Sequence, residues 1–296
     1  MYRRSWTKKR FPAFWPDSQT CAAIRTYLRP YDLLRIGKLT DRSLAMERLF
    51  GIGKRDDMGM SAYCSKLEPS FAEWRAHQLD RSYRKELDKK TRQLNRMGKA
   101  RFECADGPAA IRTIFDALKF YRGNRFDGSD GPADLLQQAS YFGFYLAVAN
   151  EGCGGFARTY AMWMNDRPIA GALGLEHRGS LLVILNGFDE EGYRRQSTGS
   201  LMFEQIARDC IERGDHHLDF TIGDEPYKGI FGGQPSPMWQ IHRAGSPLGY
   251  AAHLAVEKLP AAKELARHLL ETARGKAVKP ADTAMPAASD KTAKAC

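Results

Sequence analysis

Hydrophobic residues recur at a helical spacing through much of the first half of the chain and at every second position in parts of the second half. The helical spacing predicts helices over residues 18–29 and 41–50, one or two helices over 70–97, and helices around 111–118 and over 133–149. Short alternating runs predict strands over residues 31–39, 60–67 and 101–104. The first 155 residues are therefore expected to mix helices with short strands.

After residue 155 the period of two predicts a sheet. Three alternating runs, over residues 156–163, 169–176 and 180–187, are joined by short turns and predict an antiparallel meander. A loop over 189–199 leads into a helix over 200–213, which Gly214 ends. Strands are expected over 217–222 and 238–243, and a last helix over 251–273. This order predicts an α+β fold, a mixed and mostly antiparallel sheet flanked by helices.

Composition and charge narrow the class of protein. The chain has 45 basic and 35 acidic residues in 296, a net charge of +10, so its surface attracts nucleic acid, anionic lipid, phosphorylated cofactors or acidic glycans. The longest apolar run, residues 142–149, is far shorter than the roughly 20 residues that span a bilayer, so no membrane-spanning segment is predicted. Six scattered cysteines favour a reducing compartment, and the cytoplasm is the expected location.

Four short segments carry a family resemblance. They are residues 82–87 (SYRKEL), 168–174 (PIAGALG), 185–189 (LNGFD) and 218–228 (LDFTIGDEPYK). They are similar to the BioF2-like acetyltransferase domain of the CelD/BcsL group, which is linked to cellulose and exopolysaccharide synthesis. The resemblance covers more than half of the chain. It implies the fold of the GCN5-related N-acetyltransferases (GNAT), whose order of elements matches the one predicted above.

The resemblance also implies where the domains of the chain begin and end. Proteins of this group look like two fused acetyltransferase halves and are related to the Fem-type aminoacyltransferases, whose second half has a stretch comparable to residues 227–232 (YKGIFG). The expected parts are a basic aromatic arm at 1–17, a partial first half at 18–69, the BioF2-like domain at 70–273 and a disordered tail at 274–296. The opening meander of the first half is missing, which implies a shortened chain or an internal starting methionine.

The segment before the 200–213 helix is the expected phosphate-binding site, because backbone N–H groups at a helix N-terminus bind anions. It supplies Arg194, Arg195, Gln196, Ser197, Thr198, Gly199 and Ser200. Gln196 and Gly199 resemble the acetyltransferase pyrophosphate loop, although Leu201 stands where that loop has its last small residue. The resemblance implies acetyl-CoA or another acyl-CoA as the donor. The alternative is an ordinary capped helix with exposed arginines.

Catalytic candidates follow the strand over 217–222, whose end lies beside the thioester opening in the fold that the resemblance implies. Lys228 is expected to hold a developing oxyanion or a substrate phosphate, and Tyr227 to protonate the leaving thiolate. Asp224 or Glu225 is the candidate base. The alternative is a structural turn in which Lys228 pairs with Glu225.

Candidates for substrate binding are Arg84, Lys85 and Asp219. The first two belong to the strongest basic patch, which is expected to bind an anionic acceptor such as a nucleotide sugar, a lipid phosphate or tRNA, or else to be a solvated helix face. The patch comprises Tyr83, Arg84, Lys85, Lys89, Lys90 and Arg92, while Leu87, Leu94 and Met97 share the apolar face with Tyr83. Asp219 alternates with Leu218 and Phe220 and is alternatively a polar position on the sheet.

No metal site is predicted, because His216, His217 and His242 lack the spacing of zinc ligands. Cys153 and Cys210 are expected to pack in the interior rather than to act as nucleophiles. The predicted function is transfer of an acyl group, in the first place acetyl, from acyl-CoA to an amine or hydroxyl of a sugar, polysaccharide precursor or other small acceptor. An anionic membrane surface is a further expected partner. Two alternatives stay open: a Fem-like transferase that uses aminoacyl-tRNA, and a non-catalytic module that binds nucleic acid or an anionic envelope component.

Overall fold

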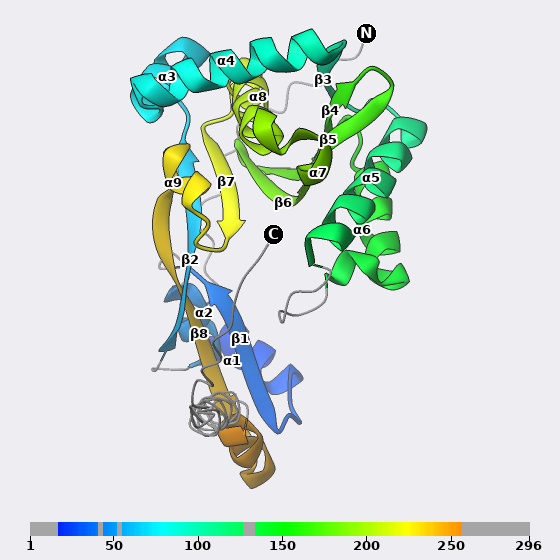
Figure 1. Ribbon diagram of the computed structural model, residues 1–296. Coiled ribbons are helices and arrows are strands. Elements are labelled where there is room, and N and C mark those ends of the chain that lie inside the picture. The colour runs from blue at the N-terminus through cyan, green and yellow to red at the C-terminus, as the bar shows by residue number, and fades with distance from the viewer. Residues whose placement is uncertain (1–16, 41–43, 52–54, 127–133, 256–296) are drawn as a thin grey trace, which may run out of the picture. The chain divides into compact units, whose positions relative to one another are not determined.

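Eight strands form one mixed sheet in the order β1–β8–β2–β7–β6–β5–β4–β3, as the computed structural model shows (Figure 1). The structure describes residues 17–40, 44–51, 55–126 and 134–255. The strands are β1 (Leu33–Leu39), β2 (Arg55–Lys66), β3 (Ala100–Cys104), β4 (Ala157–Met164), β5 (Arg167–His177), β6 (Ser180–Phe188), β7 (His217–Ile222) and β8 (Gln234–Ala244). The predicted meander is confirmed as β4–β5–β6, and so is the predicted mixed and mostly antiparallel sheet flanked by helices.

Helices form in the predicted helical segments of the described residues and also in two segments that were predicted to be a loop and a turn. They are α1 (Ser18–Tyr27), α2 (Leu44–Phe50), α3 (Phe71–Gln78), α4 (Arg81–Met97), α5 (Pro108–Phe126), α6 (Ala139–Glu151), α7 (Glu190–Tyr193), α8 (Thr198–Arg213) and α9 (Pro226–Ile230), with 3-10 turns η2 (Leu135–Gln137) and η3 (Arg194–Gln196). The segment predicted over 70–97 is thus two helices.

The chain divides into two units. The larger comprises residues 37–46 and 55–240, and the smaller residues 1–36, 47–54 and 241–296. In the smaller unit the Asp17 carboxylate caps α1 by accepting the Thr20 N–H at 2.7 Å, and Arg25 donates to the Leu49 carbonyl at 3.0 Å. The arm predicted over residues 1–17, except for Asp17, and the tail over 274–296 lie outside the described residues, as does the predicted helix beyond residue 255.

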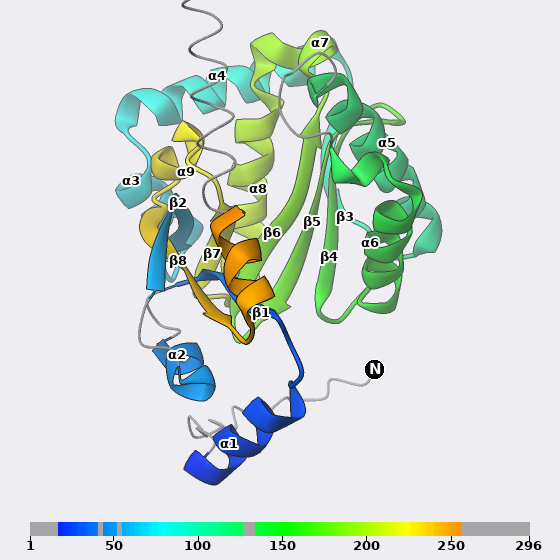
Figure 2. The same ribbon diagram turned by 90° about the horizontal axis from the view of Figure 1, so that it is seen from below.

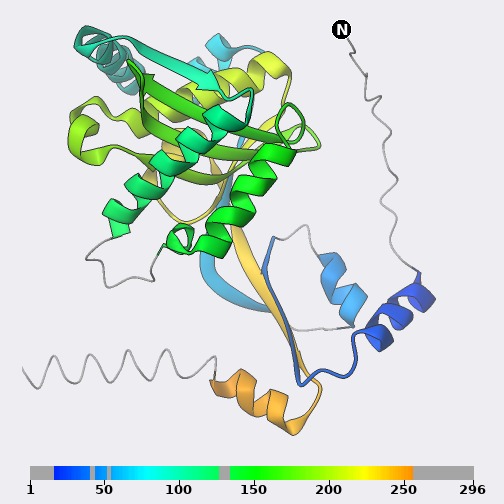
Figure 3. The same cartoon turned by 90° about the vertical axis from the view of Figure 1, so that its right-hand side faces the viewer.

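Helices cover both faces of the sheet of the larger unit (Figure 3). A hydrophobic core lies on each face. One core joins α8 to the strands through side chains that include Tyr160, Ala172, Leu201, Ile206, Leu218 and Phe220. The other joins α5 and α6 to β4, β5 and β6 and includes Ile114, Leu118, Phe142, Leu173 and Leu185. The alternation of strand side chains between two apolar layers explains why β4 and β5 are buried along almost their whole length.

Three local predictions are corrected by the structure. The segment expected to be a loop over 189–199 contains α7 and η3, because the Asp189 carboxylate accepts the Gly192 N–H at 2.8 Å and starts a helical turn. The turn after β7 contains α9, which begins at Pro226, a residue whose fixed φ suits the first turn of a helix. The helix expected over 133–149 is divided into η2 and α6.

Candidate active site

Strands β6 and β7 separate near the middle of the larger unit (Figure 2). They run parallel and pair at only three positions, from Ser180 with His217 to Leu182 with Asp219, although β6 continues to Phe188. Beyond these pairs the backbone groups on the facing edges of the two strands are no longer joined in a ladder. The β5–β6 register also shifts between Leu173 and Gly174, which leaves Ile184 as the extra residue of a β-bulge. The splayed strands and the bulge together offer unpaired backbone groups to a ligand.

The first turn of α8 follows this opening and carries the predicted phosphate loop. Ser197 has a left-handed backbone, with φ of 52°, and its hydroxyl makes no capping hydrogen bond to the helix. The first N–H groups of α8 therefore keep the anion-binding capacity of an open helix N-terminus. Gly199 approaches the Phe188 ring so closely that a Cβ there would lie 3.0 Å from a ring carbon. The small residue of the predicted loop is thus required by packing against the end of β6.

A hollow of about 1070 Å³ opens in front of this loop. Its lining combines the cations Arg167, Arg194 and Arg195 with Gln196 from the predicted set. The aromatic residues Phe120, Tyr121 and Phe188 and the acidic run 189–191 also line it. Of the acidic residues, Asp189 is already paired with Arg167 at 2.5 Å. Arg194 and Arg195 have exposed side chains at the edge of the hollow, where a phosphate group can reach them.

Helix α4 contacts the loop at two points. The Tyr83 hydroxyl donates to the Ser200 hydroxyl oxygen at 2.9 Å, and the Lys90 ammonium donates to the Arg195 carbonyl. Arg75 of α3 braces the same assembly, since its guanidinium binds Glu204 of α8 at 2.5 Å and Asp88 of α4 at 2.6 Å. The basic helix that sequence reasoning assigned to the acceptor is therefore bound to the predicted donor loop.

Lys228 is the most tightly held of the predicted catalytic residues. Its side chain is buried, and its ammonium group lies 2.8 Å from the Ile222 carbonyl, 3.1 Å from the Gly223 carbonyl and 3.4 Å from the Thr221 carbonyl. The Glu225 carboxylate, at 2.9 Å, is a fourth partner. Three ammonium protons are thus engaged by four acceptors, and Lys228 fixes the turn that follows β7.

Replacing Lys228 by methionine is expected to lower the free energy of unfolding by about 3 kcal/mol, because three carbonyl groups lose a charged donor. Urea denaturation of the purified protein measures this change, with the exposed Lys85→Met variant of α4 as the control for loss of a single charge. A loss below about 0.5 kcal/mol, the range of ordinary surface substitutions, would contradict this structural role.

The other catalytic candidates in this turn have different surroundings. The Asp224 carboxylate accepts the Tyr63 hydroxyl at 3.0 Å, an interaction that raises the pKa of Tyr63. The Tyr227 ring stacks on Phe203 of α8, with ring centroids 4.8 Å apart and planes inclined by 18°. Phe203 in turn meets the Phe188 ring at 6.2 Å. An aromatic row therefore connects the turn after β7 with the phosphate loop.

Asp219 lies at the point where β6 and β7 part, as the residue of the last pair. Its neighbours Leu218 and Phe220 are buried against α8, so its side chain is on the opposite face of the sheet. Its carboxylate accepts the Thr221 N–H at 2.7 Å. Burial raises the pKa of Asp219 above its ordinary value, an effect that this bond and the charge of Lys228 oppose.

Arg84 and Lys85 are separate from these groups. Neither lines the hollow, and the Arg84 carbonyl accepts a hydrogen bond from Arg75 at 3.2 Å. Lys85 is exposed on α4. The structure therefore brings together residues 194–200, and separately 224–228 with Asp219, but leaves the half-buried Arg84 and the exposed Lys85 outside both groups.

Comparison with known families decides the classification. The family model of the acetyltransferase (GNAT) domain matches residues 81–229, half of the chain. The chain belongs to the GNAT family. It is an acyltransferase, and the typical donor of GNAT domains is acyl-CoA. The match begins at α4 and ends in α9, so it contains the phosphate loop, the splayed strands and the turn with Lys228.

Solved structures share the fold of this GNAT protein at low sequence identity. FemX has a TM-score of 0.54 and 12% identity over 77% of each chain. The C-terminal domain of a putative lysylphosphatidylglycerol synthetase from Agrobacterium fabrum has a TM-score of 0.51 and 12% identity over 75% of this chain and 72% of that chain. L-PGS from Bacillus licheniformis has a TM-score of 0.52 and 10% identity over 82% and 77%. No curated protein sequence matched the chain.

Within the described ranges, no three His, Cys, Asp or Glu side chains cluster as a metal site would require. No helix among those residues is both long and apolar enough to cross a bilayer. Cys210 is fully buried, as predicted, and burial raises its pKa to about 12, so its thiol is not ionised near neutral pH.

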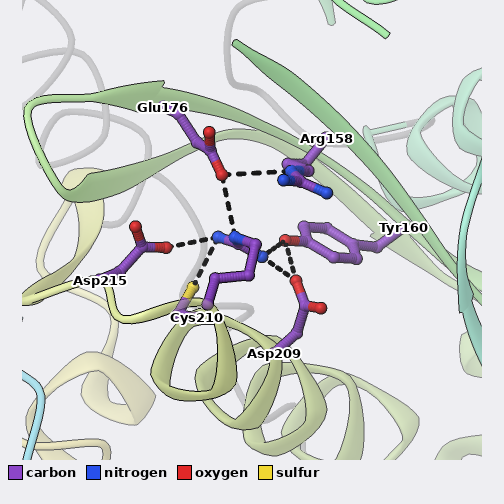
Figure 4. A network of polar contacts seen from close by, with 7 residues as sticks. Arg158, Tyr160, Glu176, Asp209, Cys210 and Asp215 are labelled. Carbon is purple, nitrogen blue, oxygen red and sulfur yellow. Dashed lines mark hydrogen bonds and ion pairs between the residues drawn. The ribbon is translucent and has the colours of Figure 1, made fainter. Parts of the chain in front are cut away.

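A second polar cluster lies at the other end of α8 (Figure 4). Arg213 is its centre: the guanidinium binds Asp209, Asp215 and Glu176, the last at 2.9 Å. It also donates to the Tyr160 hydroxyl at 2.9 Å. Further contacts are made by Arg158, which pairs with Glu176 at 3.1 Å, and by Cys210. The cluster ties the C-terminal turn of α8 to β4 and β5.

Sequence reasoning missed the roles of Lys90 and Arg213. Lys90 was part of the predicted basic patch, yet its position three residues after Leu87 and four before Leu94 places it in the apolar row of α4. A lysine at an apolar position of a helix indicates that its ammonium group has a hydrogen-bonding partner in the folded protein. Arg213 gave no such signal, because its partners come from β4, β5 and the following turn and meet only in the folded chain.

Proposed function

We propose that this GNAT protein transfers an acyl group, in the first place acetyl, from acyl-CoA to an amine or hydroxyl of a sugar or polysaccharide precursor. The observation that carries the donor is that Arg194, Arg195 and Gln196 line one hollow directly before the open first turn of α8. Two guanidinium groups and a helix N-terminus suit a diphosphate. The exposed edges of β6 and β7 suit the amides of a pantetheine chain.

In the proposed reaction the acceptor nitrogen or oxygen attacks the thioester carbonyl carbon, and the carbon–sulfur bond breaks. The acceptor gives up one proton and the thiolate takes one up, so the residues needed are a base and an acid. Asp219 is better placed as the base than Asp224 or Glu225, because those two carboxylates already bind Tyr63 and Lys228. Its raised pKa brings it nearer to the range useful for proton transfer near neutral pH.

The remaining predicted residues receive roles that agree with their contacts. Tyr227 is proposed as the acid that protonates the thiolate, as its motif suggested. Lys228 is proposed as a positioning residue, since its protons bind the carbonyl groups at the end of β7. The bulge at Ile184 leaves a backbone N–H outside the ladder, which is a suitable donor for the developing oxyanion.

The acceptor is proposed from the resemblance of four short segments to the BioF2-like domain, whose group is linked to exopolysaccharide synthesis. The similar structures are FemX, a putative lysylphosphatidylglycerol synthetase domain and L-PGS, and their shared fold supports an acyltransferase without deciding between an amine and a hydroxyl acceptor. A Fem-like use of aminoacyl-tRNA is the alternative, which the titration below tests with tRNA as the second ligand. A purely binding role is disfavoured by membership of an acyltransferase family.

Calorimetric titration with acetyl-CoA tests the donor. We expect saturable binding, weakened about tenfold or more in the Arg194→Ala/Arg195→Ala variant, because each charge-assisted phosphate contact contributes about 1.5–3 kcal/mol. The matched control is Lys89→Ala/Arg92→Ala, which removes two exposed cations of α4 that do not line the hollow. Saturable binding of tRNA without binding of acetyl-CoA would instead support the aminoacyl-tRNA alternative.

A further inference from the structure

A second hollow, of about 490 Å³, lies next to the first and shares two lining residues with it, Arg195 and Gln196. Its other walls come from α4, through Lys90, Gln93, Arg96 and Met97. The two hollows therefore adjoin at η3, and a ligand held at Arg195 has access to both. Of the basic patch that was predicted to bind the acceptor, Lys90 lines the second hollow, whereas Arg84 and Lys85 do not.

The second hollow is positively charged. Three of its six lining residues are cations, and none of the six is acidic. The Glu86 carboxylate, 4.0 Å from the Lys90 ammonium, belongs to a side chain that is 57% exposed and so offsets this charge only weakly. An unneutralised group of Lys90, Arg96 and Arg195 favours a small anion such as a phosphate monoester.

Lys90 lies in an unusual position for a phosphate-binding residue on a surface helix. It belongs to the apolar row of α4 between Leu87 and Leu94, and only 20% of its side chain is exposed. Its ammonium donates to the Arg195 carbonyl, which leaves other ammonium protons for a ligand. The charge is thus held in place before any ligand arrives, which reduces the entropy lost on binding.

Gln196 adds a hydrogen-bond acceptor to the donors that the three cations supply. Its Oε1 atom is buried and has no hydrogen-bond partner. A buried acceptor without a donor is costly, and an incoming hydroxyl or amino group removes this cost. Cations for a phosphate together with an acceptor for a hydroxyl or amino group are the requirements of a phosphorylated nucleoside.

We propose that the second hollow binds the phosphorylated nucleoside end of the donor, so that helix α4 reads the 3′-phosphate of acyl-CoA. This inference rests on the proposed function, because it takes acyl-CoA as the donor. The diphosphate lies at Arg194, Arg195 and the start of α8, and the 3′-phosphate lies at Lys90 and Arg96. Helix α4 thereby acts as a specificity element for the donor and not as a site for the acceptor.

The test compares acetyl-CoA with 3′-dephospho-acetyl-CoA by calorimetric titration of the full chain. We expect the wild-type protein to bind the dephosphorylated compound about five- to twentyfold more weakly, because it loses charge-assisted hydrogen bonds. Arg96→Gln is expected to remove most of this difference by weakening acetyl-CoA alone. Arg92→Gln makes the same change at an exposed position of α4 outside the hollow and is expected to preserve the difference.

The possible outcomes separate the inference from the proposed function. Equal affinity of the wild-type protein for both compounds would overturn the 3′-phosphate site and leave the donor proposal standing. An equal weakening of both compounds in Arg96→Gln would overturn it as well, since the arginine would then act only through general charge. Binding of neither compound to the wild-type protein would reject acyl-CoA as the donor, and this inference with it.

Discussion

Replacing Asp219 by asparagine is expected to lower the rate of acyl transfer by about 10²- to 10⁴-fold, the usual contribution of a positioned general base. Asparagine keeps the shape of the side chain and an oxygen for the Thr221 N–H, so the turn at the end of β7 is retained. The measurement is release of free coenzyme A from acetyl-CoA with glucosamine as the amine acceptor. The loss is expected in kcat more than in KM, because the carboxylate acts in proton transfer.

The pH dependence gives a second signature of Asp219. A base works in its ionised form, so kcat/KM is expected to rise with pH through the raised pKa of this carboxylate. Stability changes in the opposite direction: the folded protein holds this proton more tightly than the unfolded chain, so stability falls as pH rises between the unfolded and the folded pKa. Asp219→Asn removes that fall and is expected to be at least as stable as the wild-type protein at neutral pH.

Two comparison variants make this prediction specific. Asp106→Asn makes the same change at an exposed position before α5 and is expected to leave the rate unchanged. Asp224→Asn tests the base that the sequence suggested, whose carboxylate binds the Tyr63 hydroxyl. A loss of rate in Asp224→Asn that exceeds the loss in Asp219→Asn would return the role of base to the turn after β7.

Much of this fold was predictable because most elements are encoded locally. The meander β4–β5–β6 has a clean period of two, and α8 has both a helical period and a terminating glycine. The predictions were wrong where a single tertiary or capping contact determines the local structure. Helix α7 is an example, because it starts where Asp189 caps it. Periodicity carries no information on a four-residue helix.

The candidate site divides in the same way. The phosphate loop was predictable, because residues 194–200 are contiguous in the sequence. Their capacity to bind an anion depends on the N-terminus of a single helix. The state of Lys228 was not, since the pattern of residues 218–228 does not show that the ammonium is occupied by three carbonyl groups. The same holds for Asp219, whose value as a base depends on where β6 leaves β7 and on its burial.

Arg213→Met is expected to lower the free energy of unfolding by about 3–5 kcal/mol, the range for removing one partner of a buried ion pair and a larger loss than that expected for Lys228→Met. Its guanidinium is the shared partner of Asp209 and Asp215, and without it these two carboxylates lose their cationic partner. Tyr160, which is fully buried, also loses a donor. Methionine preserves much of the side-chain volume, so the loss reports the charge and its hydrogen bonds and not a cavity.

Urea denaturation followed by circular dichroism measures this loss, with Lys89→Met, an exposed change on α4, expected to stay within about 0.5 kcal/mol. Arg213→Lys separates charge from geometry, because one ammonium group does not bridge carboxylates on α8, β5 and the following turn as a guanidinium does. We expect Arg213→Lys to recover less than half of the lost stability. Full recovery by lysine would show that the charge alone suffices. A loss within about 0.5 kcal/mol in Arg213→Met itself would mean that the apolar core holds the C-terminal turn of α8 without the cluster.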